Sequence, residues 1–148
     1  MRTCLFLLFI FGFFHHHHAQ DIKLAGATSQ SWSGGICCRY GTNYIITLES
    51  SDTTSQISID TVWVGDTRYY DTDAYKIGVT RNIVGGKAVY NVQVSEVTDE
   101  RVEPILVKPG TVKSPYSGAA TVVCHFKHCG AQHIMVEEFK ELDPIAYP

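Results

Sequence analysis

Short stretches of alternating apolar and polar residues recur along most of this chain. The clearest is Ala88–Glu96, where Tyr90, Val92 and Val94 alternate with polar side chains. Neighbouring residues of a β-strand point to opposite faces of a sheet, so this alternation indicates a strand with one buried face. The same pattern, rich in β-branched and aromatic residues, predicts further strands at Ile22–Ala27, Tyr44–Glu49, Ile57–Val64, Tyr75–Thr80 and Ile105–Val107. Within Ile57–Val64, strict alternation places Ile57, Ile59 and Trp63 on one face.

Turn residues separate the predicted strands. Gly85-Gly86, within Val84–Lys87, supplies the positive φ angles that a tight hairpin turn requires. Gly41–Asn43 is a second turn signal, and the charged stretch Val97–Pro104 predicts a loop. The tail Glu137–Pro148 contains two prolines, so we expect an irregular end.

No window shows a helical apolar stripe, and the short strands follow one another at the spacing typical of a sandwich or barrel. The expected fold is therefore all-β: an antiparallel β-sandwich, immunoglobulin-like or fibronectin-like. We expect one domain over residues 20–148.

The amino terminus has the pattern of a secretory signal peptide. Arg2 precedes the unbroken apolar run Leu5–Phe14, which is too short to span a bilayer, and His15–His18 follow. We expect cleavage after Ala19, so that residues 1–19 are removed and the protein is secreted or periplasmic. No second apolar run reaches spanning length, which predicts no transmembrane segment in the mature chain.

Charge and composition narrow the possible partners. The whole chain has a formal net charge of −3, and loss of Arg2 makes the mature protein one unit more negative. Without any run of basic residues, nucleic-acid binding is not expected.

The mature chain contains Cys37, Cys38, Cys124 and Cys129, an even number that suits disulfides in an exported protein. A bridge between the adjacent Cys37 and Cys38 would be strained, and its companion Cys124–Cys129 would close little chain. Each cross-pairing would close roughly 90 residues and stabilise the fold by about 4 kcal/mol in the chain-entropy model. We favour Cys38–Cys124 together with Cys37–Cys129.

The stretch Thr121–Val136 predicts a β-hairpin that is unusually rich in sulfur and imidazole. As an alternative to plain disulfides, it could bind Zn or Cu, because thiolate, imidazole and thioether are suitable ligands. The candidate metal ligands are His125, His128, Cys129, His133 and Met135. Their spacing matches no standard zinc motif.

No catalytic motif is present. Cys124 and His125 are adjacent, but neighbours on a strand point apart, which argues against a catalytic dyad. We therefore expect no cofactor, no catalysis, and a binding or structural module for an unknown protein or glycan. The candidate contact residues combine aromatic rings with a positive charge and are Trp63, Arg68, Tyr69 and Tyr70.

The stretch Ser29–Tyr44, with Ser33-Gly34-Gly35 ahead of Cys37-Cys38, resembles the opening of short exported bacterial β-domain proteins of unknown activity. The resemblance implies export and a small β domain, and it implies no particular activity.

Overall fold

The structure is a computed structural model that describes residues 22–34, 39–70, 77–99, 112–126 and 129–148. These residues form two β-sheets. The larger sheet contains, in spatial order, β5 (Gly78–Val84), β6 (Lys87–Asp99), β2 (Arg39–Ser50), β1 (Ile22–Gly34) and β9 (Lys140–Tyr147). The smaller sheet contains β4 (Thr67–Tyr69), β3 (Ile57–Val64), β7 (Ala120–Phe126) and β8 (Cys129–Val136).

The all-β, sandwich-like prediction is confirmed at this level. Every strand pair is antiparallel except β1 with β9, which run parallel at one edge of the larger sheet. No helix occurs in the part of the chain that the structure describes, so none there could cross a membrane. The predicted strand Ile105–Val107 and the predicted signal peptide lie outside the described residues.

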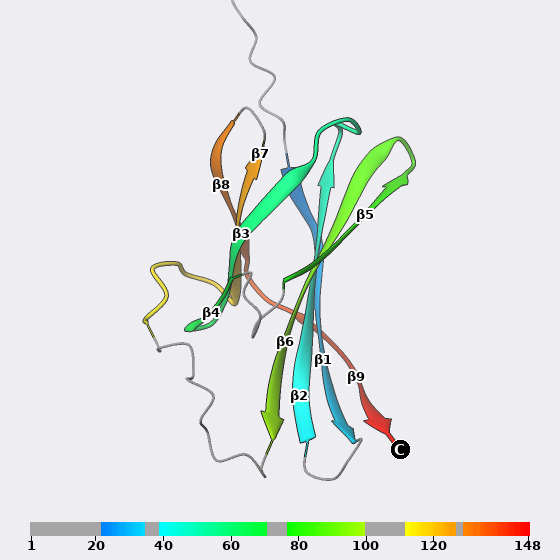
Figure 1. Cartoon of the computed structure of the whole chain (residues 1–148), viewed down its shortest axis with the longest axis vertical. Helices are drawn as coiled ribbons and strands as arrows, with labels where there is room; N and C mark the ends of the chain where they lie inside the picture. Colours follow the sequence, from blue (N-terminus) through cyan, green and yellow to red (C-terminus); the bar gives the residue numbers. More distant parts are fainter. Residues whose placement is uncertain (1–21, 35–38, 71–76, 100–111, 127–128) are drawn as a thin grey trace, which may run out of the picture.

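The core lies between the two sheets, whose arrangement can be followed in Figure 1. Ile46 and Leu48 of β2 and Val92 of β6 are almost completely buried from one side, and Val62 and Val122 from the other. The opposite face of the larger sheet is polar, where Thr47 donates to Asn91 and Ser95 donates to Asn43. This separation explains the alternation in the sequence, because only one face of each strand is covered.

Three strand ends differ from the sequence prediction. Gly41–Asn43 lies within β2 and is not a turn, because β1 and β6 pair with it on both sides. Residues 97–99 continue β6 and are not a loop. The tail is not irregular: Lys140–Tyr147 forms β9, and Pro144 is tolerated there because an edge strand needs hydrogen bonds on one side only.

The predicted face of β3 is also wrong at Trp63. The pairing of β3 with β7 shifts between Ile59 and Thr61, which is a β-bulge at Asp60. An extra residue reverses the alternation, so Ile57 and Ile59 pack against the core while Trp63 faces outward.

The hairpin turn between β5 and β6 is confirmed. Gly85 and Gly86 have φ angles of 57° and 75°, the left-handed values that glycine adopts without strain. Farther along β6, the hydroxyl of Tyr90 donates to the carbonyl oxygen of Ser55 at 2.8 Å. This bond attaches the connector between β2 and β3 to the larger sheet.

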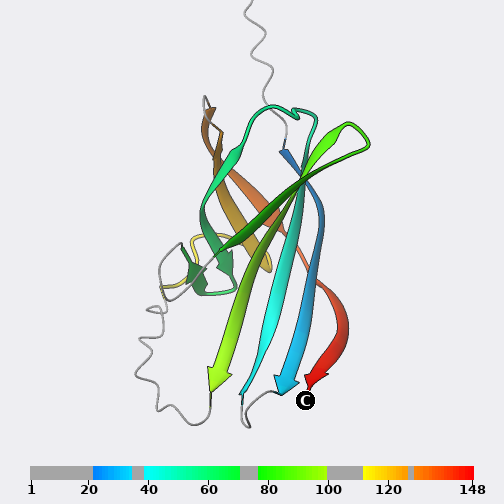
Figure 2. The same cartoon turned by 45° about the vertical axis from the view of Figure 1, so that its right-hand side comes forward.

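The two sheets differ in length, and this positions the candidate sites. In Figures 1 and 2 the lower ends of β1, β2, β6 and β9 extend past the smaller sheet. Among the described strands, none of the smaller sheet covers this end of the face that holds the core higher up. The turn between β5 and β6, the end of β7 and the start of β8 lie at the opposite end.

Candidate functional site

Cys124 is a free cysteine in the middle of the core, with 0% of its surface exposed. It lies on β7 opposite Ile59 of β3 and Gln132 of β8. Burial, and to a smaller extent the negative charge of Asp60, raises the pKa of the Cys124 thiol to about 11. A thiol in this environment is a small apolar core residue and not a nucleophile.

The arrangement of the strands bears on the predicted disulfides. Phe126 of β7 pairs with Ile57, the first residue of β3, and with Cys129, the first residue of β8. Strand β3 comes after the Ser50 end of β2, whereas Arg39 lies at the other end of β2. The length of β2 corresponds to about 36 Å at the usual rise, far beyond the separation of about 7 Å that a disulfide allows between Cα atoms. The described strands thus place Phe126 and the backbone of Cys129 near one end of the sandwich and Arg39 at the other.

Within the predicted hairpin, Cys124 and Cys129 are also poorly placed for each other. Cys129 pairs with Phe126, two residues from Cys124, which is a displacement of about 7 Å along β7 in addition to the spacing of about 5 Å between strands. Cys37, Cys38 and the side chain of Cys129 lie outside the described residues, so disulfides that involve them stay a prediction.

The predicted β-hairpin is present as β7 and β8, and two of its histidines can be placed. His125 Nε2 lies 2.5 Å from Asp60 Oδ2 at the bulge of β3. The ring of His133 meets the ring of Tyr116 edge to face at 5.1 Å. Within the described ranges, no three His, Cys, Asp or Glu side chains gather closely enough to hold a metal ion.

The remaining candidate ligands add little to a metal site. Met135 is exposed, and its sulfur accepts a hydrogen bond from Ser117 at 3.4 Å. His128 lies outside the described residues, as does the side chain of Cys129. Zn or Cu binding therefore stays a prediction.

The aromatic and charged residues of β3 and β4 divide between two faces. Tyr69 is 3% exposed and belongs to the core. Arg68 points the other way, with its guanidinium 5.8 Å from the ring centre of Trp63 and 5.6 Å from that of Tyr70. Tyr116 packs edge to face against Trp63 at 6.5 Å. We call Trp63, Arg68, Tyr70 and Tyr116, on the outer face of the smaller sheet, the Arg68 surface. Trp63 is only 7% exposed, with Arg68 and Tyr116 packed against its ring.

Two arginines illustrate two uses of the same side chain. Arg81 also lies over an aromatic ring, that of Tyr90, but it donates to the Tyr90 hydroxyl and to the carbonyl oxygen of Thr53. Arg68 has no hydrogen-bond or ion-pair partner in the described part of the chain, and its side chain is exposed. Arg81 therefore makes hydrogen bonds within the protein, to Tyr90 and to the backbone of Thr53. The Arg68 guanidinium lies against two rings and is exposed to solvent.

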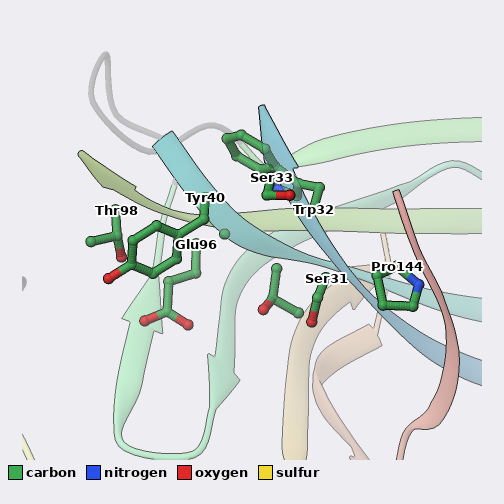
Figure 3. A pocket seen from close by; sticks show the side chains of 9 residues that line it. Ser31, Trp32, Ser33, Tyr40, Glu96, Thr98 and Pro144 are labelled. Atoms are coloured by element: carbon green, nitrogen blue, oxygen red, sulfur yellow. The ribbon is translucent and has the colours of Figure 1, made fainter. Parts of the chain in front are cut away.

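Sequence analysis missed a second candidate site, an open hollow of about 330 Å³ on the uncovered end of the larger sheet. Figure 3 shows Tyr40, Glu96 and Thr98 pointing into the same space, with Ser31 and Pro144 beside them. Burial and the carboxylate of Glu96 raise the pKa of the adjacent Tyr44, and a hydrogen bond with Thr42 partly offsets this. Serine, threonine and tyrosine in a strand carry no functional signal by themselves, so only the geometry reveals this site.

Comparison with known proteins identifies no relative: no family model, no curated protein and no solved structure matches this chain.

Proposed function

We propose that the protein is an exported, non-catalytic binding module that recognises carboxylate-bearing partners at the Arg68 surface. One observation carries this proposal. The Arg68 guanidinium lies 5.8 Å from the ring centre of Trp63 and 5.6 Å from that of Tyr70, while its N–H groups have no acceptor among the described residues. Aromatic residues and arginine are the side chains most enriched at sites of recognition.

Guanidinium chemistry defines the ligand. A planar guanidinium can donate two parallel hydrogen bonds to one carboxylate, and its orientation between two rings reduces the entropy lost on binding. Tyr70 is 42% exposed and offers an apolar ring beside the charge. The proposal therefore requires a carboxylate next to an apolar group, as in an acidic glycan or an acidic peptide.

The experiment measures binding by calorimetry with two probes, tetragalacturonate and tetraglutamate, at low ionic strength. Arg68→Lys keeps the charge but loses the bidentate fork, and we expect it to weaken binding about tenfold. Arg81→Lys is the matched control, because it makes the same change at an arginine that holds the protein's own chain. The probe that binds identifies the partner as glycan or peptide.

The methyl ester of tetragalacturonate supplies the matched ligand control. It keeps the sugar chain and removes the negative charges, so it should not bind at the Arg68 surface. Equal affinities for the acid and its ester, or equal losses from Arg68→Lys and Arg81→Lys, would contradict the proposal.

We also propose that the sandwich is of the immunoglobulin type. Strands β1, β2, β6 and β5 follow the order A, B, E, D of that fold, and β4, β3, β7 and β8 follow the order C′, C, F, G. The order supports the class, although β9 has no counterpart and Cys124, on the strand equivalent to F, is free. An experimental structure with a different strand order would contradict it.

Export rests on the sequence of residues 1–19 and on the resemblance to short exported bacterial proteins. Detection of the mature amino terminus by mass spectrometry of a secreted or periplasmic fraction tests it.

A further inference from the structure

The hollow at the end of the larger sheet is built on a regular grid. Ser31, Thr42 and Glu96 form one row across β1, β2 and β6. The next row is Ser33, Tyr40 and Thr98. Both rows lie on the same face of the sheet as the core residues Ile46, Leu48 and Val92. Beyond the core, this face carries mainly polar side chains.

The two sides of this end of the sheet differ. On the opposite side, the indole of Trp32 lies over Gly41, where a Cβ atom would collide with the carbonyl oxygen of Glu96 and touch the indole. Trp32 also packs edge to face with Tyr147 at 6.3 Å. Gly41 therefore lets the strands and the indole approach closely behind the hollow, which supports its floor.

The chemical character of the lining limits what can bind. Five of its side chains carry hydroxyl groups, and each hydroxyl can both donate and accept a hydrogen bond. Tyr40 is 45% exposed and presents a ring face, while Pro144 of β9 forms an apolar wall. Among the described residues of the lining, Glu96 is the one carboxylate, and none is a lysine or an arginine.

Each of these features excludes a ligand class. An anionic ligand would meet the Glu96 carboxylate, and no described residue of the lining offers a compensating positive charge. One carboxylate does not provide the several oxygen ligands that a hard cation requires. A purely apolar ligand would remove hydroxyl groups from water without replacing their hydrogen bonds.

We propose that this hollow binds a neutral sugar unit of a glycan. A sugar has hydroxyl groups that donate and accept, and apolar C–H faces that pack on an aromatic ring. The volume of about 330 Å³ lies at the lower end of the range typical of small-ligand sites. Because the hollow is open, a unit within a longer chain fits as well as a terminal one. This site is separate from the Arg68 surface and does not depend on it.

Calorimetric titration with five neutral hexasaccharides tests the inference: cellohexaose, xylohexaose, laminarihexaose, maltohexaose and chitohexaose. We expect saturable binding of at least one of them. Tyr40→Ala should abolish it, because the ring face is lost. Thr42→Val and Glu96→Gln should each weaken it about tenfold, because each removes hydrogen bonds to the sugar.

Ser95→Ala is the matched control, since Ser95 precedes Glu96 on β6 and bonds Asn43 on the opposite face. This variant and Arg68→Lys should leave sugar affinity unchanged, and the latter separates this test from that of the proposed function. No saturable binding of any probe up to about 10 mM would overturn the inference. An unchanged affinity in Tyr40→Ala would also overturn it, because the sugar would then bind elsewhere.

Discussion

The Cys124 thiol allows a quantitative test of the packing between the two sheets. Replacing it by alanine removes one buried sulfur atom from a position with 0% exposure. Loss of a group of this size, with the small cavity that remains, should lower the free energy of unfolding by about 1–2 kcal/mol at neutral pH. Chemical denaturation of wild type and Cys124→Ala measures this difference.

The difference should depend on pH in a defined direction. Burial raises the pKa of the folded Cys124 thiol from its ordinary 9.0 to about 11. Between these values the folded protein keeps a proton that the unfolded chain has lost, so stability from this group is complete below pH 9 and falls as pH rises. At about pH 10 the loss amounts to roughly 1.4 kcal/mol relative to neutral pH. The advantage of wild type over Cys124→Ala should therefore nearly vanish there.

Thiol labelling provides the second measurement. The raised pKa lowers the thiolate fraction at neutral pH about 100-fold, and burial blocks access as well. Unfolding without a reductant should expose one thiol that Cys124→Ala lacks. If the stability difference stays constant with pH and the variant loses no thiol, the sulfur is in a disulfide, and this description of the core is wrong.

Three further predictions concern single features of the molecule. Tyr90→Phe removes two part-buried hydrogen bonds, those with Arg81 and Ser55, so it should lower the free energy of unfolding by about 1–3 kcal/mol in urea. Tyr147→Phe, at an exposed position, should change it little. Gly85→Ala puts a side chain at a φ of 57° and should cost about 1–2 kcal/mol in the same assay, whereas Gly26→Ala meets no atom within 4 Å and should be tolerated. Elemental analysis of protein purified without a nickel column should find no stoichiometric Zn or Cu; near-equimolar metal that is lost in His133→Ala would establish the alternative function.

The sequence predicts the part of the fold that depends on one buried face. The alternation in Ala88–Glu96 is visible because the core covers Tyr90, Val92 and Val94 and water covers the residues between them. The Gly85-Gly86 turn is predictable for a local reason, since few other residue pairs adopt its φ angles.

Other features depend on distant parts of the chain and leave no local signal. Gly41–Asn43 has the composition of a turn, and only its two neighbouring strands make it extended. The bulge at Asp60 turns Trp63 outward, which strict alternation cannot foresee. The hollow exists because the strands of the larger sheet extend past the smaller sheet. The relative length of two sheets cannot be predicted from any single stretch of sequence.

The most direct test of the proposed function observes the arginine side chains themselves. In an NMR titration with whichever of tetragalacturonate or tetraglutamate binds more tightly, the Nε–Hε signal of Arg68 should shift progressively and saturate. The signal of Arg81, which already donates to Tyr90, should stay in place. If Arg68 remains unperturbed while either probe binds, its guanidinium is not the recognition group, and the proposed function is wrong.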